Sequence, residues 1–258
     1  MVISNERLLV VTEEGHIHCF AEERQLPKVY DEPRSNYLVA PRVDVAPLIE
    51  AAGTTDGYCL YVGIKNQDKI EALLRSTDFH VFVIDNDEQQ IERLREEFDA
   101  TGEYGERIVT RLGDLRSLKL PPYFANLVVC DKPELAGDSI TDIGKTLYHA
   151  VRPYGGALCV AGLDTSEFVA TSGLPKAKPR TIEGYAAVNR IGELPGAADW
   201  THEYGDAANT LMSQDDLVKA PLGLLWYGGP SSDGSLFFDR HDWAPSATII
   251  DGRMFFQG

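Results

Sequence analysis

Acidic residues lie where successive apolar segments end, and their spacing could serve nucleoside binding. Gly63 follows the apolar run 58–62, and Asp85 comes 22 residues after that glycine, at the end of the next run. One strand–helix–strand unit takes about 20 residues, and a carboxylate ending its second strand can accept hydrogen bonds from both hydroxyls of a ribose. Asp114 follows the third run, where a carboxylate could reach the amino group of an adenine. Asp131 follows the fourth run and is a candidate general base.

These residues need a sheet that brings the ends of the apolar runs to one edge. The sequence alternates short apolar runs with segments whose apolar residues recur at helical spacing, which predicts buried strands separated by amphipathic helices. The predicted strands span 58–62, 80–84, 107–112, 126–130 and 157–161, and the predicted helices span 67–76, 87–100 and 138–151. Right-handed crossovers then give an α/β, doubly wound, mostly parallel sheet with helices on both faces.

Changes in composition and in the spacing of apolar residues divide the chain into four parts. They are a β-hairpin at 1–30, a linker at 31–42, the strand–helix domain at 43–195 and a β-rich, loop-rich segment at 196–258. Near the end of the domain, residues 173–180 are rich in Pro and Lys and predict a loop, and residues 185–191 predict a strand added at the sheet edge. The strands predicted outside the domain span 7–12, 16–20, 222–227 and 247–250.

Composition excludes several classes of function. The 258 residues include 40 acidic and 24 basic side chains, so a formal net charge of −16 disfavours general nucleic-acid binding. No apolar run approaches the roughly 18 residues of a membrane span. The four cysteines form no CxxC pair, which disfavours a zinc ribbon or a redox dithiol, and three of them lie in apolar runs and should be buried. His16 and His18 lack a third ligand nearby, so no metal site is predicted.

The central part of the chain resembles the Rossmann-like S-adenosylmethionine-dependent methyltransferases. The resemblance covers residues 43–163 and rests on the order and spacing of the segments 59–63, 81–85, 111–115, 125–131 and 151–158. It implies S-adenosylmethionine as the cofactor and a methyl acceptor that the sequence does not identify. Gly63 would lie under the methionine and ribose, Asp85 would bind the ribose hydroxyls, and Asp114 with the Leu115 backbone would bind the adenine.

The first loop departs from the family pattern. Tyr61 stands where the family has an acid, and Lys65 and Gln67 stand where it has further glycines, so their side chains should crowd the cofactor. The resemblance then leaves Asp68 as a substitute partner for the cofactor ammonium. These departures keep a second hypothesis open, in which the domain has kept its fold but lost its cofactor and serves as a binding or scaffold insert. A nicotinamide dehydrogenase is disfavoured because no Gly-x-Gly-x-x-Gly follows the first strand.

The two ends of the chain carry another resemblance. Residues 7–20 and 200–256 look like strand–turn–strand pieces of β-propeller repeats related to pyrroloquinoline-quinone enzymes. The hypothesis that follows is a methyltransferase-like domain inserted into a propeller, with the rest of that propeller as a partner in a longer parent chain. A complete chain is expected to be cytoplasmic, since residues 1–7 lack the order of a signal peptide; a fragment of an exported protein leaves the compartment open.

Overall fold

The chain forms two compact units in this computed structural model. They comprise Met1–Pro33 and Arg34–Gly258. The described residues are 2–4, 7–12, 16–21, 43–218 and 247–255. The predicted linker at 31–42 and the predicted strand at 222–227 lie outside them, and the proposed division into four parts stays a prediction.

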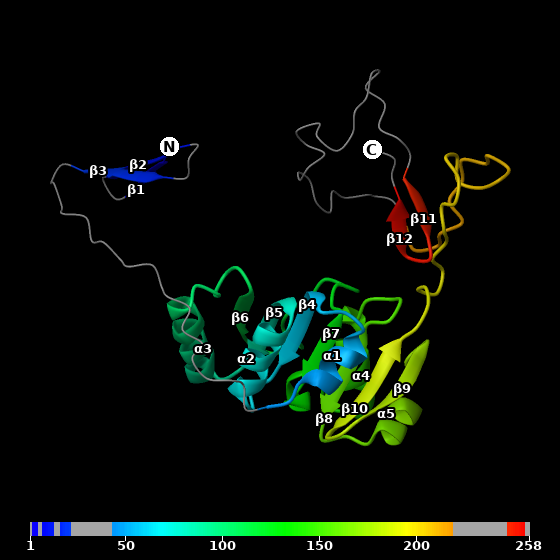
Figure 1. Cartoon of the computed structure of the whole chain (residues 1–258), viewed down its shortest axis with the longest axis horizontal. Helices are drawn as coiled ribbons and strands as arrows, with labels where there is room; N and C mark the ends of the chain where they lie inside the picture. The colour runs from blue at the N-terminus through cyan, green and yellow to red at the C-terminus, as the bar shows by residue number, and fades with distance from the viewer. Residues whose placement is uncertain (1, 5–6, 13–15, 22–42, 219–246, 256–258) are drawn as a thin grey trace. The chain divides into compact units, whose positions relative to one another are not determined.

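The first unit contains a three-stranded antiparallel sheet. Its strands are β1 (Val2–Ser4), β2 (Arg7–Val11) and β3 (Ile17–Phe20), in the order β1-β2-β3 (Figure 1). The pairing of β2 with β3 confirms the two predicted hairpin strands, whereas β1 was not predicted. The predicted turn at 13–15 lies outside the described residues.

The second unit is built on a seven-stranded, mostly parallel sheet. Its strands are β4 (Asp56–Val62), β5 (Asp78–Asp85), β6 (Ile108–Leu112), β7 (Leu127–Cys130), β8 (Ala157–Ala161), β9 (Ala177–Ile182) and β10 (Tyr185–Arg190). They lie in the order β6-β5-β4-β7-β8-β10-β9. Neighbours from β6 to β8 pair in parallel, and β10 runs antiparallel to both β8 and β9. Continuous burial of β7 and β8 fits strands covered on both faces.

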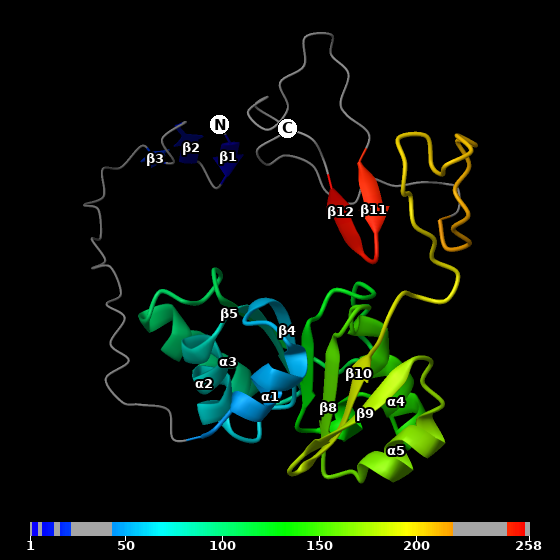
Figure 2. The same ribbon diagram turned by 45° about the vertical axis from the view of Figure 1, so that its right-hand side comes forward.

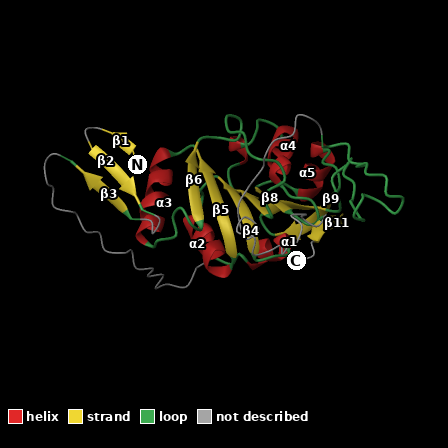
Figure 3. Ribbon diagram, turned by 90° about the horizontal axis from the view of Figure 1, so that it is seen from above, coloured by secondary structure: helices red, strands yellow, loops and turns green. Residues whose placement is uncertain are grey.

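In the described part of the second unit, five α-helices and a short 3-10 helix pack on the two faces of this sheet. They are α1 (Ala46–Ala52), α2 (Gln67–Ser76), α3 (Glu88–Ala100), η1 (Pro133–Leu135), α4 (Ile140–Ala150) and α5 (Thr165–Ser172). Helices α1, α2 and α3 bury their apolar residues in one core cluster, and α4 and α5 bury theirs in another. Figure 3 shows α1 and α2 on one side of the sheet and α4 and α5 on the other.

The three predicted helices of the domain are confirmed because apolar spacing and capping agree. Asn66 accepts a hydrogen bond from a backbone amide at the start of α2, Asp87 accepts two at the start of α3, and Ser139 accepts one at the start of α4. The five predicted strands of the domain are also confirmed as β4 to β8.

The strand predicted at 185–191 is confirmed as β10, but its position and the structure predicted for 173–180 are wrong. The segment 173–180 was expected to be a loop, but Ala177–Ile182 forms β9, and the strand expected at the edge is the inner strand β10 (Figure 2). The reason is that β9 is itself the edge. An edge strand tolerates Pro179, which has no N–H, and its Lys and Arg side chains stay in solvent.

The connectivity creates a switch point beside β4. The chain passes from β4 outward to β5 and β6, and then returns to β7 on the other side of β4. In open α/β sheets, ligands bind beyond the carboxyl ends of the strands at such a switch point. The carboxyl ends of β4, β5 and β7 carry Gly63, Asp85 and Asp131, so the topology brings these three residues to one edge as predicted.

The tail forms one further described hairpin. Strands β11 (Thr248–Ile250) and β12 (Arg253–Phe255) pair antiparallel, and Trp200 pairs with Ile249. The strand predicted at 247–250 is therefore confirmed. None of the helices in the described part of the chain is long and apolar enough to span a membrane.

The predicted burial of three cysteines is confirmed, and it allows a test of the fold. Cys59, Cys130 and Cys159 are inaccessible, whereas Cys19 is exposed. Burial raises the pKa of the Cys159 thiol from 9.0 to about 12 and raises those of Cys59 and Cys130 as well. A rise of this size lowers the thiolate fraction about a thousandfold. We expect Ellman's reagent to modify only Cys19 rapidly in the native protein, and all four thiols in guanidinium chloride. Fast modification of a second thiol without denaturant would contradict the fold.

Candidate functional site

Asp85 is a fully buried carboxylate at the carboxyl end of β5. Its Oδ2 accepts a hydrogen bond of 2.5 Å from the backbone N–H of Ile64, and its Oδ1 accepts one of 2.9 Å from that of Asp87. The loop after β4 and the start of α3 are thus both held by one side chain. A buried carboxylate with this position could accept hydrogen bonds from a ribose, but it needs partners in the protein when no ligand is present.

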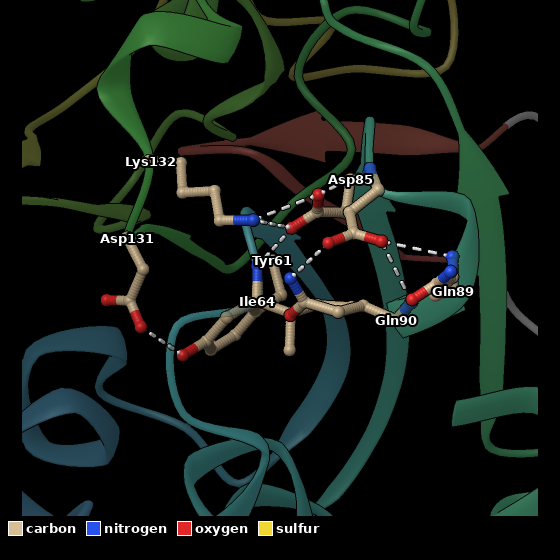
Figure 4. A network of polar contacts seen from close by, with 8 residues as sticks. Tyr61, Ile64, Asp85, Gln89, Gln90, Asp131 and Lys132 are labelled. Atoms are coloured by element: carbon tan, nitrogen blue, oxygen red, sulfur yellow. Dashed lines mark hydrogen bonds and ion pairs between the residues drawn. The ribbon is translucent and has the colours of Figure 1, made fainter. Parts of the chain in front are cut away.

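A further partner of Asp85 is Lys132, in the loop after β7. The ammonium Nζ lies 2.8 Å from Oδ2 and 3.0 Å from Oδ1 of Asp85, and the Lys132 side chain is only 17% exposed (Figure 4). Both oxygens of the predicted ribose-binding carboxylate are therefore engaged by the chain's own lysine.

Lys132 also covers Gly63. This glycine has a φ of +83°, and a Cβ atom built on it would lie 2.7 Å from the backbone N and 2.5 Å from Cγ of Lys132. The loops after β4 and β7 are tied together, because the backbone N–H groups of Asp131 and Lys132 both donate to the Val62 carbonyl, at 2.8 and 3.3 Å. The resemblance places the methionine and ribose in the space above Gly63. In this structure Lys132 occupies that space.

Asp131 is the centre of a second buried cluster. It is 1% exposed and accepts hydrogen bonds from the hydroxyls of Tyr61, at 2.6 Å, and Tyr185, at 2.9 Å. The ammonium of Lys69, in α2, lies 3.0 Å from Oδ2 and 3.1 Å from Oδ1, and donates to the Tyr185 hydroxyl at 2.7 Å. Figure 4 shows the Asp131 side chain turned toward Tyr61, and the Lys132 side chain turned toward Asp85.

The cluster holds its two tyrosines in the neutral form. Burial raises the pKa of the Tyr61 hydroxyl, and the negative charge of Asp131 raises it further; the same two causes raise the pKa of Tyr185. Both phenols therefore act as hydrogen-bond donors to Asp131. Because its oxygens are engaged by three side chains, Asp131 would have to release one of them before it could accept a proton, and its role as a base stays a prediction.

The predicted adenine-binding residues are engaged within the protein. The backbone N–H of Leu115 donates to the carbonyl of Leu135 at 2.9 Å, and the Leu115 side chain is buried. Asp114 accepts hydrogen bonds from the backbone N–H groups of Arg116 and Ser117 and pairs with the Arg116 guanidinium. Desolvation tends to raise the pKa of Asp114, but the Ser117 hydrogen bonds and the Arg116 charge outweigh it and lower this pKa. Asp114 thus stabilises its own turn as an anion.

The side chains expected to crowd the first loop lie elsewhere. Lys65 is exposed, and Gln67 donates its side-chain N–H to Glu97 of α3. Asp68 is exposed in the first turn of α2, and its backbone N–H donates to the cap residue Asn66. The structure thus places Asp68 on the helix surface, and the crowding over Gly63 comes from Lys132.

The structure brings together Gly63, Asp85 and Asp131, but through partners that the sequence interpretation did not name. These partners are Lys132, Lys69 and Tyr185, while Tyr61 was noted only as a missing acid. One sequence signal was available: Asp131 and Lys132 are adjacent, so an acid and a lysine both follow the predicted strand 126–130. The site holds two lysines for two buried carboxylates, which compensates both charges.

A hollow of about 420 Å³ lies away from the carboxyl ends of the strands. It is lined by Tyr58 of β4, His80 and Phe82 of β5, Val109 of β6, and Phe124. Residues 113–126, all of which the structure describes, contain no helix to cover this part of the sheet. None of the predicted site residues lines this hollow.

No protein-family model and no curated protein matches the sequence. Among solved structures, the chain is similar to a protein from Methanococcus maripaludis assigned as an S-adenosyl-L-methionine-dependent methyltransferase; identity is 13% and the TM-score 0.48, over 57% of this chain and 84% of that one. A SAM-dependent methyltransferase from Aquifex aeolicus is 13% identical with a TM-score of 0.40, over 55% and 85%. One from Mesorhizobium loti is 16% identical with a TM-score of 0.34, over 42% and 48%. The strand order given above defines the chain's own fold as a Rossmann-like α/β fold with a mostly parallel sheet.

Proposed function

We propose that the second unit is an S-adenosylmethionine-dependent methyltransferase whose methyl acceptor is unidentified. The observation that carries this proposal is Asp85, a fully buried carboxylate at the carboxyl end of the strand next to the switch point. The flanking amides of Ile64 and Asp87 hold this carboxylate in place. The cofactor, when bound, would supply a methyl group on a positively charged sulfur.

The carboxylates and the backbone amide of the site could bind a nucleoside, but in this structure they form hydrogen bonds with other residues of the chain. Asp85 would accept from the ribose hydroxyls, and Leu115 N–H with Asp114 would bind the adenine. In this structure Lys132 engages Asp85, and the Leu135 carbonyl accepts the Leu115 N–H. Binding therefore requires these internal contacts to be exchanged for contacts to the ligand, which lowers affinity.

We expect Asp85→Asn to weaken the binding of S-adenosylhomocysteine at least tenfold. A hydrogen bond to a charged group contributes about 1.5–3 kcal/mol, which corresponds to roughly 10- to 150-fold in affinity. Titration calorimetry with the wild type and the variant, each checked for folding by circular dichroism, measures the difference.

The control for this test is Asp99→Asn, because Asp99 is an exposed acid on α3 and its change removes the same charge. Its affinity should equal that of the wild type. If the Asp85→Asn variant binds S-adenosylhomocysteine as tightly as the wild type, Asp85 does not contact the ligand. The titration should also be run on Lys132→Ala, a variant that removes the ammonium paired with Asp85. If neither the wild type nor this variant gives binding heat, the proposed function is contradicted.

A second candidate function is favoured by the Lys132–Asp85 pair itself. A domain whose loop after β7 satisfies Asp85 and Leu115 internally could serve as a cofactor-free binding or scaffold module. In that case neither S-adenosylhomocysteine nor adenosine would shift the melting temperature at millimolar concentration. The propeller interpretation of the chain ends stays a prediction, because the described strands β1–β3 and β11–β12 form small separate sheets, whereas propeller blades have four strands.

A further inference from the structure

We propose that Lys132 is an internal occupant of the ribose position, and that a nucleoside can bind only when this side chain leaves Asp85. This inference rests on the proposed function, because it concerns the same site. It adds that the wild-type chain restrains its own site, and it names the residue that does so.

A single short segment makes the contacts to Asp85 and to the Leu115 N–H that a nucleoside would replace. Lys132 binds both oxygens of Asp85 and covers Gly63, and three residues later the Leu135 carbonyl accepts the Leu115 N–H. These are the positions expected for the ribose and the adenine. The segment 132–135 thus contacts both the expected ribose-binding carboxylate and the expected adenine-binding amide.

Within this segment, the Lys132 side chain is the part that can move most easily. Its backbone is bound to Val62, and η1 begins at the next residue, Pro133. Among the described residues, its ammonium forms an ion pair with Asp85 alone, and the side chain keeps 17% of its surface in solvent. A lysine ammonium on a flexible four-carbon stem is strongly hydrated, so it can turn into water without leaving an unpaired buried charge of its own.

The cost of moving Lys132 falls on Asp85. This carboxylate is fully buried and would lose the one charged partner that it has in the described part of the chain, which is unfavourable unless other donors replace the ammonium. Two vicinal hydroxyls of a ribose are such donors, whereas a ligand with a single hydroxyl replaces only part of the interaction. The arrangement therefore favours ligands with an intact ribose diol over their deoxy analogues.

The test compares the wild type with Lys132→Ala by titration calorimetry, using S-adenosylhomocysteine, adenosine and 2′-deoxyadenosine. We expect Lys132→Ala to bind S-adenosylhomocysteine and adenosine at least tenfold more tightly than the wild type, with a smaller gain for 2′-deoxyadenosine. Lys145→Ala is the matched control, because Lys145 is exposed on α4, and it should leave all three affinities unchanged. Lys132→Ser, which also removes the ammonium but keeps a small polar side chain, is the second variant should the alanine variant fail to fold.

The outcomes separate this inference from the proposed function. Equal affinities in the wild type and the Lys132 variants would overturn the inference and leave the proposed function intact. No binding to any variant would overturn both. A gain of the same size for adenosine and 2′-deoxyadenosine would also overturn the inference, because the Lys132 ammonium would then not be standing in for the diol.

Discussion

Asp131→Ala is expected to lower the free energy of unfolding by about 3–5 kcal/mol, the range for removing one partner of a buried ion pair. The change leaves the Lys69 ammonium and the hydroxyls of Tyr61 and Tyr185 without their shared acceptor. Lys69 can turn toward solvent, since its side chain is 23% exposed, but Tyr61 is fully buried and its hydroxyl would stay unsatisfied. Urea unfolding followed by circular dichroism measures the loss.

The matched control is Asp138→Ala, which removes the same side chain from an exposed pair. Asp138 is 86% exposed and pairs with Arg116 at 3.1 Å, so its loss should cost less than about 1 kcal/mol. Adding Tyr61→Phe to the Asp131→Ala variant removes the orphaned hydroxyl and should recover part of the stability. A loss from Asp131→Ala no larger than that from Asp138→Ala would show that the cluster contributes little to folding.

The cluster also shows which parts of the site could be predicted from the sequence. Gly63, Asp85 and Asp131 were found because each follows a continuous apolar run, and strand ends meet at one edge of a parallel sheet. A strand end of this kind can be recognised from the residues next to it in the sequence. The bounds of α2 were predicted for the same reason, since its apolar residues and its cap all lie within a dozen positions.

The partners of these acids could not be predicted in the same way. The Lys132–Asp85 pair joins residues 47 positions apart, and the Tyr185–Asp131 hydrogen bond joins residues 54 apart. Which side of the sheet edge a strand-end side chain takes depends on how the loop after the strand is tied down. Here the two amides that bond to Val62 direct Asp131 and Lys132 to different clusters, and no spacing rule contains that information. The edge strand β9 was missed for a related reason, because its Pro and Lys content is typical of a loop unless the strand is known to be an edge.

The close contact between the loops after β4 and β7 predicts that Gly63→Ala is strongly destabilising. Alanine at a φ of +83° costs about 1–2 kcal/mol, and its Cβ would lie 2.7 Å from the backbone N of Lys132. That backbone cannot move away without breaking the bonds to Val62, so overpacking adds about 1–3 kcal/mol. We expect a total loss of about 2–5 kcal/mol in the free energy of unfolding, measured in urea.

Gly102→Ala is the matched control for this prediction, since it isolates the contact from the backbone conformation. Gly102 has a φ of +77°, and a Cβ there would meet nothing within 4 Å, so only the conformational cost of about 1–2 kcal/mol applies. The difference between the two variants reports how firmly the loop after β7 is held over Gly63. If both variants lose the same free energy of unfolding, the loop after β7 can move away from Gly63 at little cost. The space above Gly63 would then be available to a ligand at little cost, and Lys132 alone, rather than the tied backbone beneath it, would restrain the site.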